Sequence, residues 1–318
     1  MRNSAAHSTA TRPAAPADDS DVPIPYMART RAYYQALGYA EPYRWAHFAE
    51  VPFAPLLKPL SESRIGLVTT AALHDPALGD QGPGAAYNAA AKFHRVYAHP
   101  TAGAPDLRIS HVTYDRDHTS AEDPNCWFPL AQLKRCAAEG MIGSVSPHFY
   151  GAPTTRSQRT TIERDAPEIL AALREDKVDA MVLVPNCPVC HQTISLMARH
   201  LESAGIPTVI MGCAKDIVEH VGVPRFLFSD FPLGNAAGKP MDSGAQILAI
   251  DLAFELLAVA PVARTTIQSP LRWRNDAAWK RDFCNVERLS PADLEHLRTA
   301  HEDHRDVART GRAKPSGE

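Results

Sequence analysis

Two cysteines three residues apart, Cys187 and Cys190, are the residues of this chain best suited to chemistry. They follow the apolar stretch 181–184 and open a segment with helical spacing, with Pro188 preorganising its first turn. A thiol in the first turn of a helix faces unpaired N–H groups and the positive end of the helix dipole, so its thiolate is favoured. Cys190 is close enough for an internal disulfide, and His191 could accept or supply a proton. The pattern indicates redox or thiolate chemistry.

Two other interpretations of these cysteines stay open. Free cysteines are often simply buried apolar residues of a core. Alternatively, Cys187, Cys190, Cys213 and a histidine could bind zinc. A structural zinc site normally has a second closely spaced ligand pair, which this sequence lacks, and it has no HExxH motif. We therefore expect no bound metal. Three histidines of the C-terminal helix are expected to be solvated, namely His296, His301 and His304.

Alternating strands and helices must position the two thiols. Apolar runs predict strands at 65–70, 107–114, 141–145, 178–184, 206–211 and 225–229. Helical spacing predicts helices at 130–139, 167–177, 187–203 and 214–221, and a core-facing amphipathic helix at 245–260. This alternation favours right-handed βαβ crossovers. The predicted fold class is α/β, a doubly wound, mostly parallel sheet with helices on both faces, a disordered N-terminal tail and peripheral C-terminal helices.

Ligands of open parallel sheets bind beyond the carboxyl ends of the strands. The residues that follow the predicted strands are 69–70, 111–115, 186–191, 212–213 and 230–235. From these groups we expect the catalytic residues to be Cys187, Cys190 and His191. The expected substrate-binding residues are Thr69, Thr70, Asn186, Cys213, Asp230 and Asn235.

The composition divides the chain into four segments. Residues 1–21 are rich in Ala, Ser, Thr, Pro and Asp without an apolar stretch, which predicts a disordered tail and not a signal peptide. Residues 22–62 form an aromatic packing arm that lies on the body or on a partner subunit. Residues 63–262 are the α/β catalytic domain, and residues 263–318 are a peripheral helical C-terminal extension.

The charge and cysteine content exclude several classes of function. With 33 Lys and Arg against 36 Asp and Glu, the chain has no basic excess for nucleic acid. Its longest apolar stretch, 245–260, contains two acidic residues and is too short to cross a bilayer. Six cysteines without a signal peptide fit a reducing compartment. We expect a cytoplasmic, oligomeric protein that binds neither nucleic acid nor membrane.

Six segments, taken in order, resemble a known family. They are VTTAALH (68–74), DPNCWFPL (123–130), EGMIGSVSPHFYG (139–151), VDAMVLVPNCPVCHQT (178–193), ESAGIPTVIMG (202–212) and VPRFLFSDFPLGN (223–235). From about Val22 to Ala260 the chain is similar to the selenoprotein B component of the glycine, sarcosine and betaine reductases, and more closely to the selenoprotein subunit of D-proline reductase. In that family the first position of the strand-end pair is selenocysteine, where this chain has Cys187. The glycine-reductase branch has a further cysteine at the position of Thr193.

The resemblance implies a function. It implies reductive cleavage of a C–N bond in an amino acid or amine, with electrons exchanged with a dithiol/disulfide couple. Cys187 would attack the substrate carbon as a thiolate, Cys190 would resolve the product as an internal disulfide, and Asn186 could orient a carboxylate beside the helix N-terminus. A partner subunit would carry a pyruvoyl group that holds the amine and acts as electron sink, and a dithiol donor would reduce the pair. No cofactor bound by this chain itself is expected.

Two further functions remain alternatives. Cys187 and Cys213 could form the two-base arrangement of an amino-acid racemase or lyase, if the thiols face each other across a small cavity. The chain could also be a non-catalytic binding subunit whose aromatic arm docks a partner.

Overall fold

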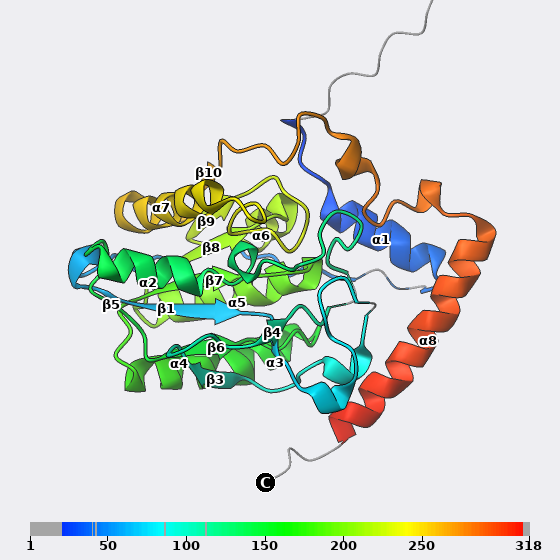
Figure 1. Cartoon of the computed structure of the whole chain (residues 1–318), viewed down its shortest axis with the longest axis horizontal. Coiled ribbons are helices and arrows are strands. Elements are labelled where there is room, and N and C mark those ends of the chain that lie inside the picture. The colour runs from blue at the N-terminus through cyan, green and yellow to red at the C-terminus, as the bar shows by residue number, and fades with distance from the viewer. Residues whose placement is uncertain (1–20, 40, 42, 86, 112, 314–318) are drawn as a thin grey trace, which may run out of the picture.

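The computed structural model describes residues 21–313, except residues 40, 42, 86 and 112. All of the expected disordered tail but its last residue therefore lies outside the described residues. The described part is an α/β fold, as the sequence predicts. Its centre is an eight-stranded sheet in the order β10-β9-β8-β7-β1-β6-β3, with the short β5 also paired to β1 (Figure 1). Neighbouring strands are parallel except β3, which is antiparallel to β6.

The strands of this sheet are β1 Arg64–Thr69, β3 Tyr97–Pro100, β5 Ser144–Val145, β6 His148–Gly151, β7 Ala180–Val184, β8 Thr208–Gly212, β9 Arg225–Phe228 and β10 Thr265–Gln268. The helices of a turn or more are α1 Tyr26–Ala36, α2 Leu130–Ala138, α4 Ala166–Glu175, α5 Pro188–Ser203, α6 Lys215–Val221, α7 Ser243–Val259 and α8 Pro291–Ala313, and the short α3 is Gln158–Thr160.

Helices cover both faces of the sheet because its central strands are apolar on both sides. In β7, Val182 and Val184 belong to a core cluster that includes residues of α2 and α7. Met181 and Leu183, which point the other way, belong to a second cluster with residues of α4 and α5. Every residue of β7 is buried. A run of apolar residues without alternation is typical of a parallel strand covered on both faces.

The order of the parallel strands reverses at β1. The chain passes from β1 through α2 to β6 on one side of β1, and then through α4 to β7 on the other side, after which β8, β9 and β10 follow outward. Such a reversal is where ligands bind in open α/β sheets. The residues that follow Thr69 and Val184 at the ends of β1 and β7 therefore occupy the preferred position for a site.

The predicted strand 107–114 is wrong for most of its length. Only Leu107–Arg108 is a strand, β4, and it pairs antiparallel with β2 (Ala72–Leu73) outside the main sheet. Its residues alternate apolar and polar, which does not suit a position covered on both faces. The place beside β1 is taken by β6, which the sequence did not predict. The segment 263–318 contributes β10, an edge strand of the main sheet, as well as helices.

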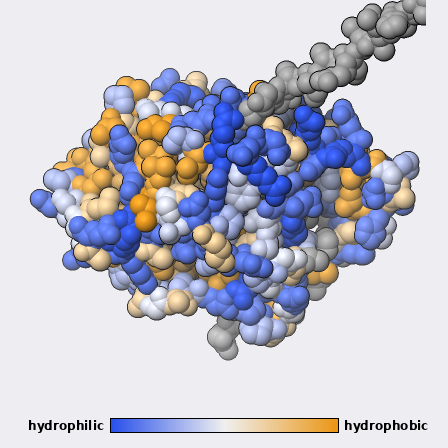
Figure 2. All heavy atoms as spheres, turned by 45° about the horizontal axis from the view of Figure 1, so that its top comes forward, coloured by the Kyte–Doolittle hydropathy of each residue, from blue (hydrophilic) through white to orange (hydrophobic). Residues whose placement is uncertain are grey.

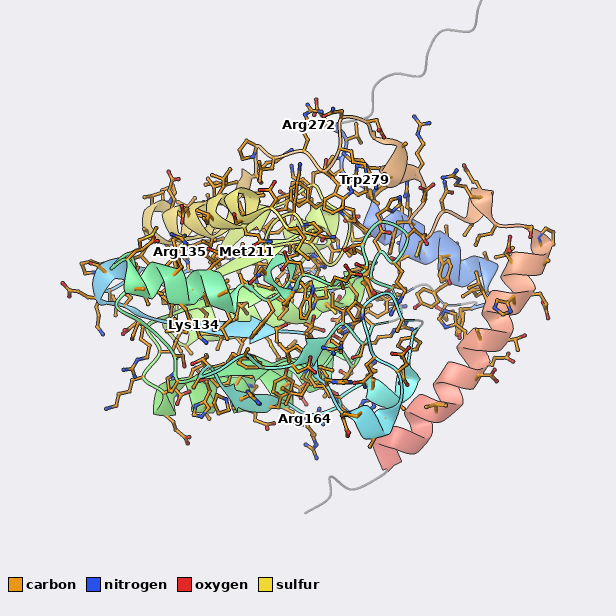
Figure 3. All side chains as sticks on the ribbon, in the orientation of Figure 1. Lys134, Arg135, Arg164, Met211, Arg272 and Trp279 are labelled. Atoms are coloured by element: carbon orange, nitrogen blue, oxygen red, sulfur yellow. The ribbon has the colours of Figure 1, made fainter. Side chains whose placement is uncertain are left out.

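Helix α7 faces the core as predicted but is not amphipathic. Ile250 and Phe254 are buried in the core, while Ile247 and Leu252 are half-buried. Figure 2 shows hydrophobic residues gathered toward the left, the side on which α7 lies in Figure 1. Arg135 of α2, labelled in Figure 3, donates to Asp251 of α7 at 3.0 Å and so joins the two helices that cover this face.

The aromatic segment 22–62 begins with α1 and continues without regular strands across α5 and α6. The Met27 N–H donates to Asp216 of α6 at 2.8 Å, and the Ala46 N–H donates to Gln192 of α5 at 2.7 Å. On α8, His296 is exposed as predicted, but His301 is buried edge-to-face among tyrosines of α1, contrary to the prediction. The His304 side chain lies outside those described. Within the described residues, none of the helices has the length and apolar character needed to cross a membrane.

Candidate functional site

The candidate site lies where the strand order reverses, at the ends of β1 and β7. Thr69 and Thr70 are both fully buried there. The Thr70 hydroxyl oxygen accepts the Asn186 N–H at 3.2 Å and thereby ties the end of β1 to the loop after β7. The Thr69 hydroxyl oxygen accepts the Ala71 N–H at 3.1 Å. Thr70 therefore holds the backbone next to the first thiol, Cys187, and Thr69 holds the turn that follows β1.

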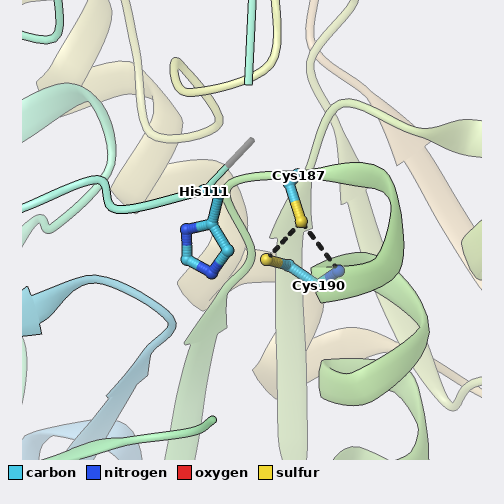
Figure 4. A group of neighbouring side chains, drawn as sticks. All are labelled: His111, Cys187 and Cys190. Atoms are coloured by element: carbon cyan, nitrogen blue, oxygen red, sulfur yellow. Dashed lines mark hydrogen bonds between the residues drawn. The ribbon is translucent and has the colours of Figure 1, made fainter. Parts of the chain in front are cut away.

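The two thiols face each other at the start of α5. Cys187 is the N-cap residue and Pro188 the first helical residue, as predicted. The Cys187 sulfur accepts the Cys190 N–H at 3.3 Å and lies 2.7 Å from the Cys190 sulfur (Figure 4). Both are free thiols, with 4% of Cys187 and none of Cys190 exposed. This proximity of two thiols is the geometry needed to interconvert a dithiol and a disulfide.

Two further residues complete the surroundings of Cys190. The Thr154 hydroxyl lies 3.2 Å from the Cys190 sulfur and 3.4 Å from Nε2 of His111. His111 is buried, and its Nδ1 has no hydrogen-bond partner among the described residues. Figure 4 shows the His111 ring beside the two sulfurs. The sequence placed His111 in a strand-end group but gave it no role, and it gave no signal for Thr154, which follows the unpredicted β6.

The pKa values of the two thiols move in opposite directions. Burial raises the pKa of Cys190, but the hydrogen bond from the Cys187 thiol, the charge of His111 and the Thr154 hydroxyl together bring it well below its usual range. Burial and the neighbouring Cys190 raise the pKa of Cys187 well above its usual range. The surroundings of the pair therefore favour the thiolate form at Cys190 over Cys187. The sequence favours Cys187 as the thiolate, because this residue opens the helix. It cannot indicate Cys190, because the partners of that thiol come from distant segments.

His191 is held in a fixed neutral form. Its Nδ1 donates to the Cys187 carbonyl at 2.7 Å, and its Nε2 accepts the N–H groups of Cys213 at 2.9 Å and Ala214 at 3.1 Å. Burial lowers the pKa of His191 to about 4. A Cβ at Gly212 would lie 3.0 Å from this ring, so glycine allows the close approach. With both ring nitrogens committed, His191 connects two loops, and this geometry does not support the expected proton transfer by it.

The remaining expected residues lie at the ends of β8 and β9 and have other partners. The Cys213 thiol donates to the Pro232 carbonyl at 3.8 Å, and burial raises its pKa. Asp230 is paired with Lys280. Asn235 donates to the Pro232 carbonyl at 3.0 Å. The structure therefore brings these three residues together around the loop after β9 and not around the thiol pair.

Cys213 also belongs to the main core cluster, whereas Cys187 belongs to a small separate cluster. The His191 ring lies between the backbones of the two residues. This is not the arrangement that a two-thiol racemase requires, in which both thiols line one cavity.

One polar group beside the thiols has no partner. Asn186 is fully buried, and both the nitrogen and the oxygen of its side-chain amide make no hydrogen bond to the described residues. An unsatisfied buried amide costs about 1–3 kcal/mol, so such a group is retained where something binds it. Asn186 directly precedes Cys187, so a ligand that satisfies this amide would lie at the thiol pair.

The electrostatic surroundings of Cys187 include two guanidinium groups. Burial lowers the pKa of Arg116, opposed by Tyr114 and, in smaller part, by the charge of Cys187. Burial also lowers the pKa of Arg156, but Tyr34 and, in smaller part, Cys187 raise it overall. Both cations thus lie within electrostatic range of the Cys187 sulfur.

The aromatic segment covers the thiol pair. Tyr43 and Trp45 pack against Cys187, Val189 and Cys190, and their rings meet edge-to-face with centroids 4.7 Å apart. The Tyr43 hydroxyl accepts a hydrogen bond from the Gln192 side chain of α5. Because of this cover, only Cys187 of the pair keeps any exposure.

A cavity of about 340 Å³ lies beside the segment that carries His111. Its lining includes Arg108, Ser110 and Tyr114, but neither thiol. Trp127 also lines it, and that side chain is buried in the core, so the turn 123–130 is packed against the body of the protein. The loop after β4 thus lines the cavity and also carries His111, which lies beside the thiol pair.

Comparisons with known proteins agree with the resemblance seen in the sequence. Residues 35–186 match the family described as glycine/sarcosine/betaine reductase selenoprotein B, so the match ends directly before Cys187. The chain is 29% identical over 224 residues to D-proline reductase subunit gamma of Acetoanaerobium sticklandii, which covers 70% of this chain and 89% of that protein.

Other relatives are longer than this chain. It is 28% identical over 198 residues to glycine reductase complex component B subunit gamma of Carboxydothermus hydrogenoformans, covering 60% of this chain and 44% of that protein. It is 27% identical over 193 residues to betaine reductase complex component B subunit beta of Peptoclostridium acidaminophilum, covering 58% of this chain and 43% of that protein. The chain thus spans less than half the length of these two relatives. No solved structure matches it. The chain is therefore similar to the selenoprotein B family of the glycine, sarcosine and betaine reductases and to a subunit of D-proline reductase.

Proposed function

We propose that this chain is the thiol-bearing component of an amino-acid or amine reductase, in which the Cys187–Cys190 dithiol supplies the electrons for cleavage of a C–N bond. The observation that carries this proposal is the pair itself. Two free thiols lie 2.7 Å apart at a helix N-terminus, next to the reversal in strand order. Its relatives are named as components of amino-acid reductase complexes.

The redox balance of this reaction fits a dithiol. Attack of the Cys187 sulfur on the substrate carbon forms a C–S bond and breaks the C–N bond, and the nitrogen leaves as an amine with one proton. Attack of Cys190 on the Cys187 sulfur then forms the disulfide and breaks the C–S bond, and the carbon takes the second proton. The substrate gains two electrons, which the two sulfurs lose. Of the two protons, one comes from the Cys187 thiol and the other from solvent, because Cys190 begins as the thiolate. An external dithiol reduces the disulfide for the next turnover.

The division of roles follows from exposure and charge. Cys187 is the thiol that keeps some exposure, so it is the one that meets substrate. Cys190 carries the negative charge 2.7 Å away and can accept the proton of Cys187 as that sulfur attacks. Its thiolate is restored when that proton passes on to the leaving amine. Cys190, wholly buried, then has Cys187 as its only sulfur within reach among the described residues.

The substrate class that fits this surrounding is a small molecule with a carboxylate. The unpartnered amide of Asn186, the helix N-terminus and the two guanidinium groups of Arg116 and Arg156 all favour an anion beside Cys187. We assign Thr69 and Thr70 to support of the backbone around this position.

The proposal includes partners. A separate subunit would carry a pyruvoyl group, which binds the substrate amine and withdraws electrons from the reacting carbon. No residue of this chain is assigned to hold that group. The side of the molecule covered by Tyr43 and Trp45 lies over the thiols, so the partner would have to reach the pair past this segment. We also propose a cytoplasmic location, where a dithiol donor is present.

The test uses the native complex, isolated through a tag on this chain. With excess dithiol it is offered D-proline, glycine, sarcosine and betaine, and both the released product and the consumed dithiol are measured. We expect equimolar product and disulfide with at least one of these substrates. Loss of this activity in Cys187→Ser and Cys190→Ser, but not in Cys213→Ser, would support the roles assigned to the two thiols. Turnover that survives in Cys187→Ser, or a complex that reduces none of the four, would refute the proposal.

A further inference from the structure

Three buried side chains beside the sheet end form a set of metal-binding donors. His111, Cys187 and Cys190 each offer one donor atom, and these atoms all lie within 4.8 Å of one another (Figure 4). The two sulfurs come from the N-terminus of α5, and the imidazole comes from the loop after β4. Segments 76 residues apart in the sequence therefore meet at one point, which spacing alone could not predict.

The donor types indicate which metal this set would bind. Two thiolates and an imidazole are the ligands of Zn²⁺ sites of the Cys₂His type, which keep a fourth position open for water or another ligand. The set is shielded from solvent, because exposure is 7% for His111, 4% for Cys187 and zero for Cys190. Within the described residues, Nδ1 of His111 has no hydrogen-bond partner. The Thr154 hydroxyl contacts the Cys190 sulfur and would hydrogen-bond this ligand as an outer group.

We infer that His111, Cys187 and Cys190 form a Zn²⁺-binding site when the two cysteines are reduced. Binding releases to solvent the protons that the two sulfurs still carry and transfers no electrons. Two Zn–S bonds of about 2.3 Å at a tetrahedral angle place the sulfurs about 3.8 Å apart. The sulfurs, now 2.7 Å apart, must therefore separate by about 1 Å. Cys187 can make this movement, because it is the N-cap residue and lies at the edge of the buried region.

Two neighbouring residues do not belong to this site. The zinc alternative considered from the sequence included Cys213, but that thiol packs in the main core and its backbone N–H is bound to His191. His191 itself has both ring nitrogens in hydrogen bonds to backbone groups. His111 is therefore the histidine of the set. This assignment differs from both expectations drawn from the sequence, namely no metal, or a metal with Cys213.

Metal binding and dithiol oxidation exclude each other. A disulfide between Cys187 and Cys190 removes two of the three donors, and a bound Zn²⁺ holds both sulfurs apart and blocks their oxidation. The inference goes beyond the proposed reductase function and does not depend on it, because a metal would bind this set whether or not the pair reduces a substrate. If both hold, Zn²⁺ is an inhibitor that keeps the pair reduced but inactive.

The test is a titration of the reduced, chelator-treated full chain with Co²⁺, a spectroscopic probe for Zn²⁺ sites. We expect one equivalent to produce a thiolate-to-metal charge-transfer band with the strong visible absorption of a four-coordinate site, and Zn²⁺ to displace it. The oxidised protein should give no such band. Absence of the thiolate band in the reduced protein, or an equal band in the oxidised one, would overturn the inference.

Variants identify the ligands. Cys187→Ser, Cys190→Ser and His111→Gln should each weaken Co²⁺ binding at least about 100-fold, whereas Cys213→Ser should bind as the unchanged protein does. The matched control for His111→Gln is His148→Gln, because His148 lies on β6 and pairs with Asp176. A His111→Gln protein that binds Co²⁺ normally, or a Cys213→Ser protein that loses it, would contradict the assignment.

A second measurement does not need every variant to fold. In the unchanged protein, Zn²⁺ should slow alkylation of Cys187 at least about tenfold and leave the half-buried Cys284 unaffected. Equal alkylation of Cys187 with and without Zn²⁺ would count against the site. Because neither measurement involves an amino-acid substrate, failure of the metal site would leave the reductase proposal in place, and a reductase that proves inactive would leave the metal site in place.

Discussion

Strands β7 and β8 lie side by side in the sheet, and each is followed within three residues by a cysteine, Cys187 and Cys213. At the end of β7, the backbone N–H of Cys190 points to the Cys187 sulfur and a second thiol lies 2.7 Å away. At the end of β8, the N–H groups of Cys213 and Ala214 point instead to the His191 ring, and the Cys213 thiol faces a carbonyl oxygen. The same position in the fold thus produces one thiol with a reactive partner and one that is packed.

The difference shows that a strand end favours chemistry only if its free N–H groups remain available to the reactive atom. Burial raises the pKa of both Cys187 and Cys213, so burial does not distinguish them. What distinguishes Cys187 is the neighbouring thiol of Cys190, whose pKa is lowered by its contacts with Cys187, His111 and Thr154. The His191 ring contacts both strand ends. Its Nε2 accepts an N–H that follows β8, and its Nδ1 donates to the carbonyl of Cys187.

The largest expected effect comes from exchanging the thiols of the two strand ends for hydroxyls. Cys187→Ser should lower dithiol-dependent turnover at least about 10³-fold, because the group that forms the covalent bond is lost. It should also abolish the two-hydrogen mass loss that mild oxidation produces in the peptide containing both cysteines. Cys213→Ser should retain turnover and this mass change. If the two variants behave alike, the distinction between the strand ends is wrong.

Much of this comparison could be predicted from the sequence. The boundary between the apolar run 181–184 and the helix that follows marks Cys187 as an N-cap, because a buried strand and a capped helix leave strong local signals. The alternation of strands and helices gives the fold class for the same reason. The order of the motifs carries the family resemblance, and the comparisons bear out that resemblance.

The rest depends on contacts between distant segments. His111 and Thr154 reach Cys190 from 79 and 36 positions away in the sequence, and no periodicity encodes such a meeting. The prediction of a strand at 107–114 fails because a segment with one apolar face suits the small antiparallel pair of β2 and β4 as well as a strand of the main sheet. The commitment of both nitrogens of His191 depends on the loop after β8, and its position next to Cys190 in the sequence suggested proton transfer instead.

The second prediction concerns the residue shared by the two strand ends. His191→Ala should lower the free energy of unfolding by about 3 kcal/mol, because two buried N–H groups and one carbonyl lose their partner and a cavity remains. Denaturant unfolding monitored by circular dichroism measures this. His111→Ala is the matched variant and should cost about 1 kcal/mol, since the hydrogen bond between His111 and the Thr154 hydroxyl is long, at 3.4 Å. Equal losses would mean that His191 does not connect the loops.

The third prediction concerns the helix that follows β8. Burial raises the pKa of Asp216, at the start of α6, to about 6, although its carboxylate accepts the Met27 N–H. Because the folded state then holds this proton more tightly than the unfolded state, its contribution to stability falls as the pH rises from about 4 to 6. Asp216→Asn keeps an oxygen for Met27 and removes the ionised form.

Asp216→Asn should therefore raise the free energy of unfolding by about 1–2 kcal/mol at pH 7, with no gain at pH 4. Denaturant unfolding across this pH range measures the difference between the two proteins. Glu219→Gln, an exposed position on the same helix whose charge is the smallest of the causes that raise this pKa, should change the profile only slightly. A gain that is the same at pH 4 and pH 7 would show that ionisation of Asp216 is not the cause.

The smallest expected effect tests the environment that distinguishes Cys190 from Cys213. The Thr154 hydroxyl, 3.2 Å from the Cys190 sulfur, stabilises the reduced pair by donating to the thiolate. Without it, in Thr154→Val, the disulfide should become more favoured, and its reduction potential should fall by about 30 mV, the equivalent of about 1.4 kcal/mol. Equilibration in glutathione buffers, followed by alkylation and mass measurement, gives this potential. Thr154→Ser should restore it, and Thr155→Val should not change it, because the Thr155 hydroxyl faces Ser157. A potential that is the same in Thr154→Val and the unchanged protein would mean that the hydroxyl does not reach the thiolate, and that His111 and Cys187 alone lower the pKa of Cys190.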